Sequence, residues 1–159
     1  MLDISSQTAL VFLGPAAIDP PEQLVPLAGA LALAGFPSPA EDFLDDTIDL
    51  NAWLVDHPSA SFYYRASGHS MIMEGIAHDD VLLVDRSVEV MDDDLVLACW
   101  EGNAPLCKRL KLTPKGIELH SRNPHFAPIV LSPEIEVELF SITAVIRKVA
   151  RGRNRVRAG

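Results

Sequence analysis

The feature that most constrains the fold is a series of short β-rich runs that begins at residue 61 and continues almost to the C-terminus. The runs are rich in branched and aromatic residues, and turn-forming residues separate them at a spacing typical of an antiparallel β domain. A single helical turn is expected over 71–76. The expected strands are 61–67, 81–85, 95–100, 105–112, 115–119, 128–131 and 135–149. We therefore predict a mainly β protein with one compact antiparallel domain.

Two segments of different character precede this domain. Residues 1–34 alternate short apolar runs with prolines, which favours an extended arm or one brief helix that cannot bury a core alone. Residues 35–60 are expected to be a linker with a helix or an adaptable strand that docks an apolar face. That face consists of Phe43, Leu44, Ile48, Leu50 and Leu54. The domain itself spans 61–149, and a basic tail follows over 150–159.

The charge distribution limits the partners of the chain. Its net charge is -9 at pH 7, yet the last thirteen residues carry six basic side chains and no acidic one. Little or no direct binding to duplex DNA is expected, because such affinity comes largely from basic residues that neutralise phosphates. The tail is either a solvated terminus or a contact for nucleic acid or an acidic partner. No apolar run reaches the roughly 18 residues that span a bilayer, so we expect no membrane contact. The presence of only two cysteines fits a reducing, cytoplasmic setting.

The cysteines, histidines and acidic runs do not indicate a metal site. Cys99 and Cys107 are too few for a disulfide framework and lack the spacing of a zinc site. A hairpin that turns near 102–103 places them on opposite faces of the sheet, where both serve as packing residues. The histidines and the acidic run 92–94 also lack the spacing of metal ligands. No metal or other cofactor is expected.

A candidate nucleophile lies at Ser70. The motif Gly68-His69-Ser70-Met71 joins an expected strand to an expected helical turn. Such a junction exposes a side chain and directs backbone N–H groups outward, where they can hold an oxyanion. A serine at a strand end is also commonly a cap or turn residue, so the motif alone is a weak indication. His69 is a poor base for Ser70, because adjacent residues of an extended segment point to opposite sides.

A lysine on the apolar face of an expected strand strengthens the case. The two-residue period places Lys108 among leucines, while Arg109 and Lys111 face solvent. Desolvation lowers the pKa of a lysine, which can then act as a neutral general base at physiological pH. A serine and a neutral lysine can replace the serine and histidine pair of other peptidases. A snorkelling lysine at a sheet edge is the alternative. The shared face consists of Leu106, Lys108, Leu110 and Leu112.

These motifs resemble the LexA and UmuD self-cleaving superfamily. The resemblance is carried by Ala-Ser-Gly-His-Ser-Met (66–71), Gly-Ile-Ala-His-Asp-Asp-Val-Leu-Leu-Val-Asp (75–85) and Cys-Lys-Arg-Leu (107–110). In that family's pattern a serine precedes Met, and a lysine lies a little under forty residues downstream. Ser70 and Lys108 occupy those places. Asp79-Asp80 departs from the family's common Asp-Gly-Asp, which leaves the turn geometry there open.

Segments 34–40 and 48–51 resemble UmuD-type proteins in particular, so the resemblance covers about residues 34–149. It implies self-cleavage between Ala34 and Gly35, with Ser70 as nucleophile and Lys108 as general base. A small residue followed by glycine suits a strand that must enter a narrow cleft. The backbone N–H groups of Ser70 and Met71 are expected to hold the oxyanion.

The resemblance also implies a biological role. It indicates an SOS-response protein whose cleavage is promoted by a RecA filament on single-stranded DNA. The trimmed form is expected to be an accessory subunit of a Y-family translesion polymerase of the UmuC type. A homodimer is implied as well, and strand 135–149 is either its surface or an internal strand. Cleavage in cis and cleavage in trans both remain open.

Three alternatives compete with this role. A LexA-type repressor needs a helix-turn-helix domain of some sixty residues before the cut site, and only about 34 residues precede it here. A signal peptidase of the same catalytic class needs a membrane anchor. A non-catalytic interaction module with an inactive site is the third alternative.

Overall fold

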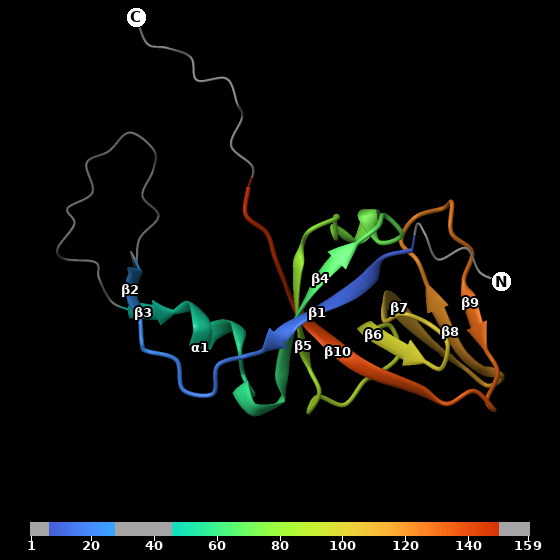
Figure 1. The fold of residues 1–159 in the computed structure, drawn as a ribbon, viewed down its shortest axis with the longest axis horizontal. Coiled ribbons are helices and arrows are strands. Elements are labelled where there is room, and N and C mark those ends of the chain that lie inside the picture. Colours follow the sequence, from blue (N-terminus) through green and yellow to red (C-terminus); the bar gives the residue numbers. More distant parts are fainter. Residues whose placement is uncertain (1–6, 28–45, 150–159) are drawn as a thin grey trace, which may run out of the picture.

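The computed structural model describes residues 7–27 and 46–149 and is mainly β, as predicted (Figure 1). The helices are α1 (Leu50–Leu54), η2 (Pro58–Ala60) and η3 (Ile72–Glu74). The strands are β1 (Ala9–Pro15), β2 (Leu24–Leu27), β3 (Asp46–Asp49), β4 (Ser61–Ser67), β5 (Val81–Asp85), β6 (Leu95–Trp100), β7 (Leu106–Thr113), β8 (Gly116–His120), β9 (Ile129–Leu131) and β10 (Val137–Ile146). None of the described helices is long and apolar enough to cross a membrane.

Eight of the described strands form one antiparallel sheet in the order β1-β4-β5-β10-β6-β7-β8-β9. An additional pairing places Ala9 of β1 opposite Leu106 of β7 and joins the sheet back on itself. Six strands, from β1 to β7 in the sheet order, therefore form a closed ring, which β8 and β9 extend. β2 and β3 form a separate ribbon at the other end of the molecule from β8 and β9 (Figure 1).

The strands predicted from residue 61 onward all form, and the predicted helical turn is η3. The largest difference is at the end of the last strand, which stops at Ile146 rather than at 149. β10 lies between β5 and β6: Ser141–Ile146 pair with β5 on one side, and Val137–Ser141 pair with β6 on the other. The strand is therefore part of the sheet, and its role as a homodimer surface stays a prediction.

β1 and β2 both form in the segment where the sequence indicated no strand, and β1 is the one that joins the main sheet. Residues 9–15 were expected in an extended arm, but they pair with β4 and complete the ring. The pairing register shifts between Phe12 and Gly14, where Gly14 has a φ of 151°. After β1 the chain is anchored by the Ala16 amide, which donates to the carbonyl of Ser61 at 2.9 Å. β1 is thus a short strand with a bulge near its C-terminal end.

The segment between the ribbon and β4 only partly follows the prediction. Asp49 caps α1 by accepting from the amides of Asn51 and Ala52 at 2.9 and 3.3 Å. The expected docking of an apolar face is wrong for Leu50, which stays 55% exposed. Leu54 does pack against the small buried cluster around Val55. Phe43 and Leu44 lie outside the described residues.

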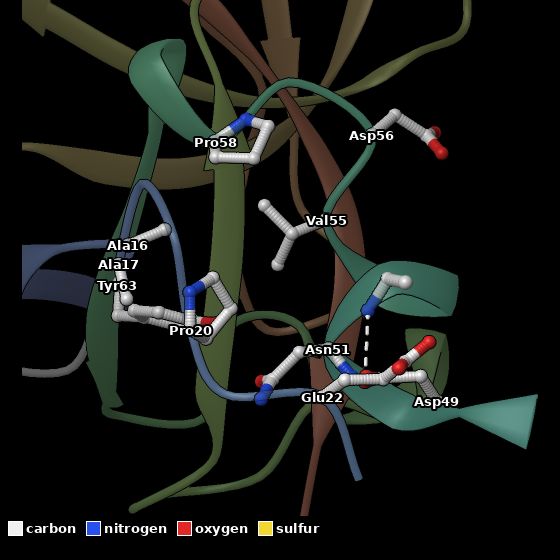
Figure 2. Close-up of a pocket in the computed structure, with 11 residues that line it drawn as sticks. Ala16, Ala17, Pro20, Glu22, Asp49, Asn51, Val55, Asp56, Pro58 and Tyr63 are labelled. Atoms are coloured by element: carbon white, nitrogen blue, oxygen red, sulfur yellow. Dashed lines mark hydrogen bonds between the residues drawn. The ribbon is translucent and has the colours of Figure 1, made fainter. Parts of the chain in front are cut away.

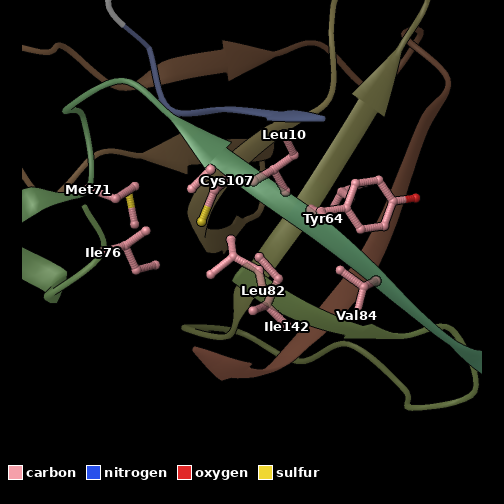
Figure 3. Packing of buried hydrophobic residues seen from close by; sticks show 10 residues of the cluster. Leu10, Tyr64, Met71, Ile76, Leu82, Val84, Cys107 and Ile142 are labelled. Carbon is pink, nitrogen blue, oxygen red and sulfur yellow. The ribbon is translucent and has the colours of Figure 1, made fainter. Parts of the chain in front are cut away.

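The larger core cluster fills the inside of the ring and holds the turn that follows β4 (Figure 3). Met71 and Ile76 come from that turn, and both have no exposed surface. Burial of each such side chain contributes about 1.5–3 kcal/mol. The position of Ser70 is therefore fixed by the core next to it. The side chains labelled in Figure 3 are Leu10, Tyr64, Met71, Ile76, Leu82, Val84, Cys107 and Ile142.

The prediction that the two cysteines face opposite sides of the sheet is wrong. Leu97 lies opposite Cys107, and Cys99 lies two residues from Leu97, so both cysteines pack against the same apolar cluster. The hairpin register differs by one residue from the expected one, and a shift of one residue exchanges the faces. Both are free thiols, and burial raises the pKa of Cys107 to about 12. Their predicted packing role is confirmed.

Candidate active site

Ser70 lies in the tight turn between β4 and η3. Gly68 starts this turn with a φ of 102°, in the left-handed region that glycine adopts without strain. Met71 then anchors the turn in the core, and Ser70 itself has no exposed surface. The side chain of the serine points into the molecule toward β7, where Lys108 Nζ lies 2.8 Å from its Oγ.

Lys108 occupies the apolar face that the sequence predicted, between the buried Leu106 and Leu110. The expected face ends there, because Leu112 is 48% exposed at the end of β7. The lysine has no exposed surface, and this burial lowers its pKa to about 8 from an ordinary 10.5. Desolvation disfavours the charged form, so a substantial fraction of neutral amine exists near physiological pH. The structure therefore brings the two predicted residues together as a hydroxyl and a perturbed amine.

Two further side chains contact the lysine, and the sequence indicated neither. Lys108 Nζ donates to Ser121 Oγ at 2.7 Å and also to Oε1 of Gln7. The Phe126 ring centroid lies 5.8 Å from the same nitrogen. Ser121 and Gln7 carry no local motif, and Gln7 is 101 residues from Lys108 in the chain. Only the tertiary structure brings these groups to the site.

The loop after β8 holds Ser121 in place by bonding to the Ser70 turn. The Arg122 amide donates to the Ser70 carbonyl at 2.9 Å, and the Met73 amide donates to the Arg122 carbonyl at 2.9 Å. The Asn123 side-chain amide donates to the His69 carbonyl at 3.0 Å. The nucleophile's turn and the loop that carries Ser121 therefore form one hydrogen-bonded unit.

An ion pair ties the same turn to the strand that carries the lysine. Glu74 accepts a hydrogen bond from Arg109 Nε at 3.1 Å and a second one from a terminal nitrogen of the same guanidinium. Arg122 Nε lies 3.3 Å from Oε2 of the same carboxylate. The hydrogen bonds from Arg109 lower the pKa of the Glu74 carboxyl. Because Arg109 follows Lys108 directly, this contact fixes the turn against β7.

The turn before β5 explains the Asp79-Asp80 variation noted in the sequence. Asp79 has a φ of 71°, in the left-handed region that glycine prefers and aspartate tolerates. Asp80 is buried and accepts from Arg147 Nε and Nη2 at 2.6 and 2.5 Å, and its Oδ2 also accepts from the Ala77 amide at 2.8 Å. Arg147 Nη2 also donates to the Gly75 carbonyl at 2.6 Å. The turn therefore forms with aspartate instead of glycine in the left-handed position.

A separate hollow of about 430 Å³ lies between residues 16–22 and the α1 region (Figure 2). Asp49, whose cap of α1 is drawn as a dashed line in Figure 2, lines it together with Val55 and Tyr63. Neither Ser70 nor Lys108 borders it. Asp49 is used in capping the helix, and the hollow does not reach the serine or the lysine, so it does not form part of the candidate site.

The predicted cleavage residues, Ala34 and Gly35, lie outside the described residues, and so does the basic tail 150–159. The turn that contains the predicted oxyanion donors, the amides of Ser70 and Met71, does adjoin the nucleophile. The roles of these four residues therefore stay predictions. The described residues contain no group of three or more His, Cys, Asp or Glu side chains that could hold a metal ion.

Comparisons with known proteins place this chain in a family. Residues 26–146 match the Peptidase S24-like family. The chain is 38% identical to protein SamA of Salmonella typhimurium over 131 residues, which are 82% of this chain and 90% of that protein. It is 40% identical to protein MucA of Escherichia coli over 111 residues, 69% of this chain and 74% of the relative.

A third relative is the LexA repressor of Proteus mirabilis. It is 33% identical over 131 residues, which are 82% of this chain and 62% of the repressor. The match with the family model spans most of the chain and includes both the Ser70 turn and β7. The chain therefore belongs to the Peptidase S24-like family, as a UmuD-type member of the LexA and UmuD superfamily.

Proposed function

We propose that the chain is a self-cleaving serine peptidase, with Ser70 as nucleophile and Lys108 as general base. The observation that carries this proposal is the 2.8 Å contact between Lys108 Nζ and Ser70 Oγ, two groups without exposed surface. A buried amine of lowered pKa next to a hydroxyl can take the hydroxyl proton as the oxygen attacks. Membership of a peptidase family supports the same kind of activity.

The proposed substrate is the chain's own Ala34–Gly35 bond. Ser70 Oγ attacks the Ala34 carbonyl carbon while Lys108 takes the hydroxyl proton, and the Ser70 and Met71 amides stabilise the oxyanion. When the carbon–nitrogen bond breaks, Lys108 gives the proton to the Gly35 amine and leaves Ala34 as an ester of Ser70. Water then hydrolyses this ester, with Lys108 again as base, and restores the serine.

The proposed biological role is that of a UmuD-type SOS protein in the cytoplasm. A RecA filament on single-stranded DNA stimulates the cleavage, and the trimmed homodimer joins a Y-family translesion polymerase of the UmuC type. This role rests on the UmuD-type membership of the chain and on its similarity to SamA and MucA.

The test is the intact mass of purified protein after incubation at alkaline pH, or with RecA, nucleotide and single-stranded DNA. Ser70→Ala and Lys108→Ala are compared with Lys111→Ala, which removes an exposed lysine of the same strand. A fragment that begins at Gly35 is expected from the original protein and from Lys111→Ala only. If no protein yields a fragment under either condition, the chain is a non-catalytic interaction module.

A further inference from the structure

We infer that residues 7–10, called here the closing segment, occupy the peptide-binding cleft of the Ser70–Lys108 site and must leave it before the Ala34–Gly35 strand can enter. This inference rests on the proposed function, and it adds how access to the site is regulated. The key observation is that Ser70 and Lys108 are both fully buried, although a peptidase site has to admit a peptide strand. In the described structure, the closing segment is what fills the space next to them.

The closing segment binds as an added strand. It pairs Ala9 with Ser67 of β4 on one side and with Leu106 of β7 on the other. The Cys107 amide donates to the Thr8 carbonyl at 2.9 Å, and the Leu10 amide donates to the Pro105 carbonyl at 2.8 Å. Backbone pairing with a sheet edge is a general way for proteins to bind an extended peptide. The seam between β4 and β7 is therefore built to hold an extended strand, and the chain's own N-terminal strand lies there.

The segment also contacts both reactive groups. The Thr8 amide donates to Ser70 Oγ at 2.9 Å, and the Gln7 side-chain oxygen accepts from Lys108 Nζ. Thr8 has no exposed surface, and Gln7 is 8% exposed. A scissile carbonyl must come within about 3–3.5 Å of the nucleophile to react. No second strand fits there while Thr8 is bound.

The bound segment is not itself in a reactive orientation. An amide N–H lies in the plane of its peptide group, so a hydrogen bond along that N–H keeps Ser70 Oγ close to the plane of the Gln7–Thr8 bond. Attack on a carbonyl carbon requires approach from above that plane. Residues 7 and 8 therefore block the nucleophile without being its substrate.

The structure also contains the means of release. The Thr8 hydroxyl is buried, and no described residue bonds to it, which disfavours the closed state. Only Ala9 of β1 is in register with β7, and the bulge before Gly14 separates residues 9–12 from the end of β1. The Ala16 amide remains bonded to Ser61 at the other side of that bulge. Release as far as the bulge breaks the pairing of residues 9–12 with β4 and withdraws Leu10 from the core, while the Ala16–Ser61 bond beyond the bulge can stay formed.

The first test cross-links the segment to β4. Ala9 lies directly opposite Ser67, and the Cα spacing of either kind of antiparallel pair falls within the disulfide range. In the Ala9→Cys, Ser67→Cys protein, self-cleavage under oxidising conditions is expected to be at least tenfold slower than after reduction of the same sample. The Ala9→Cys and Ser67→Cys single variants, which keep only Cys99 and Cys107 besides the introduced cysteine, should show no such dependence on the oxidant. Equal rates in the oxidised and reduced double variant would overturn the inference.

The second test does not depend on self-cleavage. In a Ser70→Cys protein, the rate of iodoacetamide labelling at position 70 is mapped by mass spectrometry with and without Gln7→Ala. Because Gln7→Ala removes the contact with Lys108, labelling is expected to become several-fold faster. Gln23→Ala, which changes an exposed glutamine of the same arm, should leave the rate unchanged. If Gln7→Ala also leaves it unchanged, the inference fails, whereas absence of cleavage in every protein contradicts only the proposed function.

Discussion

Lys108 Nζ lies 2.8 Å from Ser70 Oγ, although 38 residues separate the two in the chain. The serine is held by a turn whose Met71 is buried in the core, and the lysine belongs to a strand of the closed ring. Neither side chain meets solvent, so the lysine loses most of the hydration that would stabilise its charge. The pair therefore combines a fixed distance with an amine that deprotonates near neutral pH.

The lowered pKa of Lys108, about 8, predicts the pH dependence of self-cleavage. Only the neutral amine accepts a proton, so the rate should fall about tenfold for each pH unit below 8 and level off above pH 9. The measurement is the first-order rate constant for loss of intact protein from pH 6 to 10 without a filament. Lys111→Ala should give the same profile, and a rate independent of pH across this range contradicts the assignment of Lys108 as base.

Ser121 is predicted to position the lysine. Its hydroxyl accepts from Lys108 Nζ at 2.7 Å, so Ser121→Ala removes an acceptor that orients the amine and stabilises its charged form. The plateau rate should fall about tenfold, a typical loss for a supporting hydrogen bond, and the midpoint of the pH profile should move to lower pH. Ser121→Thr keeps the hydroxyl and should restore both quantities. A loss of rate with an unchanged midpoint would indicate a merely structural role.

The pair formed by Asp80 and Arg147 is predicted to be asymmetric in its effect on stability. The side chain of Asp80 is 2% exposed and that of Arg147 is 50% exposed. Arg147→Ala leaves a buried carboxylate without its partner and should lower the free energy of unfolding by about 3 kcal/mol. Asp80→Asn leaves an arginine that water can solvate, so its effect should be smaller, about 1 kcal/mol. Urea unfolding at pH 7 measures both.

Unfolding measured at acidic pH provides the control for the pair of Asp80 and Arg147. The hydrogen bonds from Arg147 lower the pKa of Asp80 below its ordinary 3.8. A carboxylate with a lowered pKa contributes stability above its unfolded-state pKa, and that contribution is lost as the pH falls through the folded-state value. The difference between the original protein and Arg147→Ala should therefore shrink below pH 3.8. If Asp80→Asn lowers the free energy of unfolding at pH 7 more than Arg147→Ala does, Asp80 is not the buried partner.

The sequence predicted those parts of the fold that have a local signal. The alternation around Lys108 and the turn residues between strands are enough to find β4 to β10, and the resemblance leads to Ser70. The contacts of Gln7, Thr8 and Ser121 had no such signal, because each depends on segments that meet only after the ring closes. Prolines near β1 also suggested an arm, although Pro15 lies at the very end of that strand, where it disrupts little.

The register of a hairpin was another property that local reasoning did not determine. The turn near 102–103 was found, but a difference of one residue changed the face of Cys99 relative to Cys107. Register depends on how both strands bury their side chains against β10 and the core. The apolar face of β7 also ends earlier than expected, at Leu110 instead of Leu112. This end depends on where β7 leaves the ring, and the two-residue period of the sequence does not reveal that point.

Thr8→Val is predicted to stabilise the closed state. The Thr8 hydroxyl is buried without a hydrogen-bond partner, and valine has the same shape without the polar atom. Removing an unsatisfied buried hydroxyl should raise the free energy of unfolding by about 1 kcal/mol. Because the closing segment then binds more tightly, self-cleavage at pH 9 should become slower. Most destabilised variants open more easily, so this combination of greater stability and lower rate is a specific signature.

Thr113→Val is the matched control for this change. The Thr113 hydroxyl donates to the Gly116 carbonyl at 3.0 Å and accepts from the Lys115 amide at 3.3 Å, so its loss should lower stability by about 1 kcal/mol. Its position in the β7–β8 turn predicts no slowing of self-cleavage. Urea unfolding gives the stability of both variants, and intact mass gives their rates of self-cleavage. If Thr8→Val is more stable and yet cleaves as fast as the original protein, release of the closing segment does not limit the reaction.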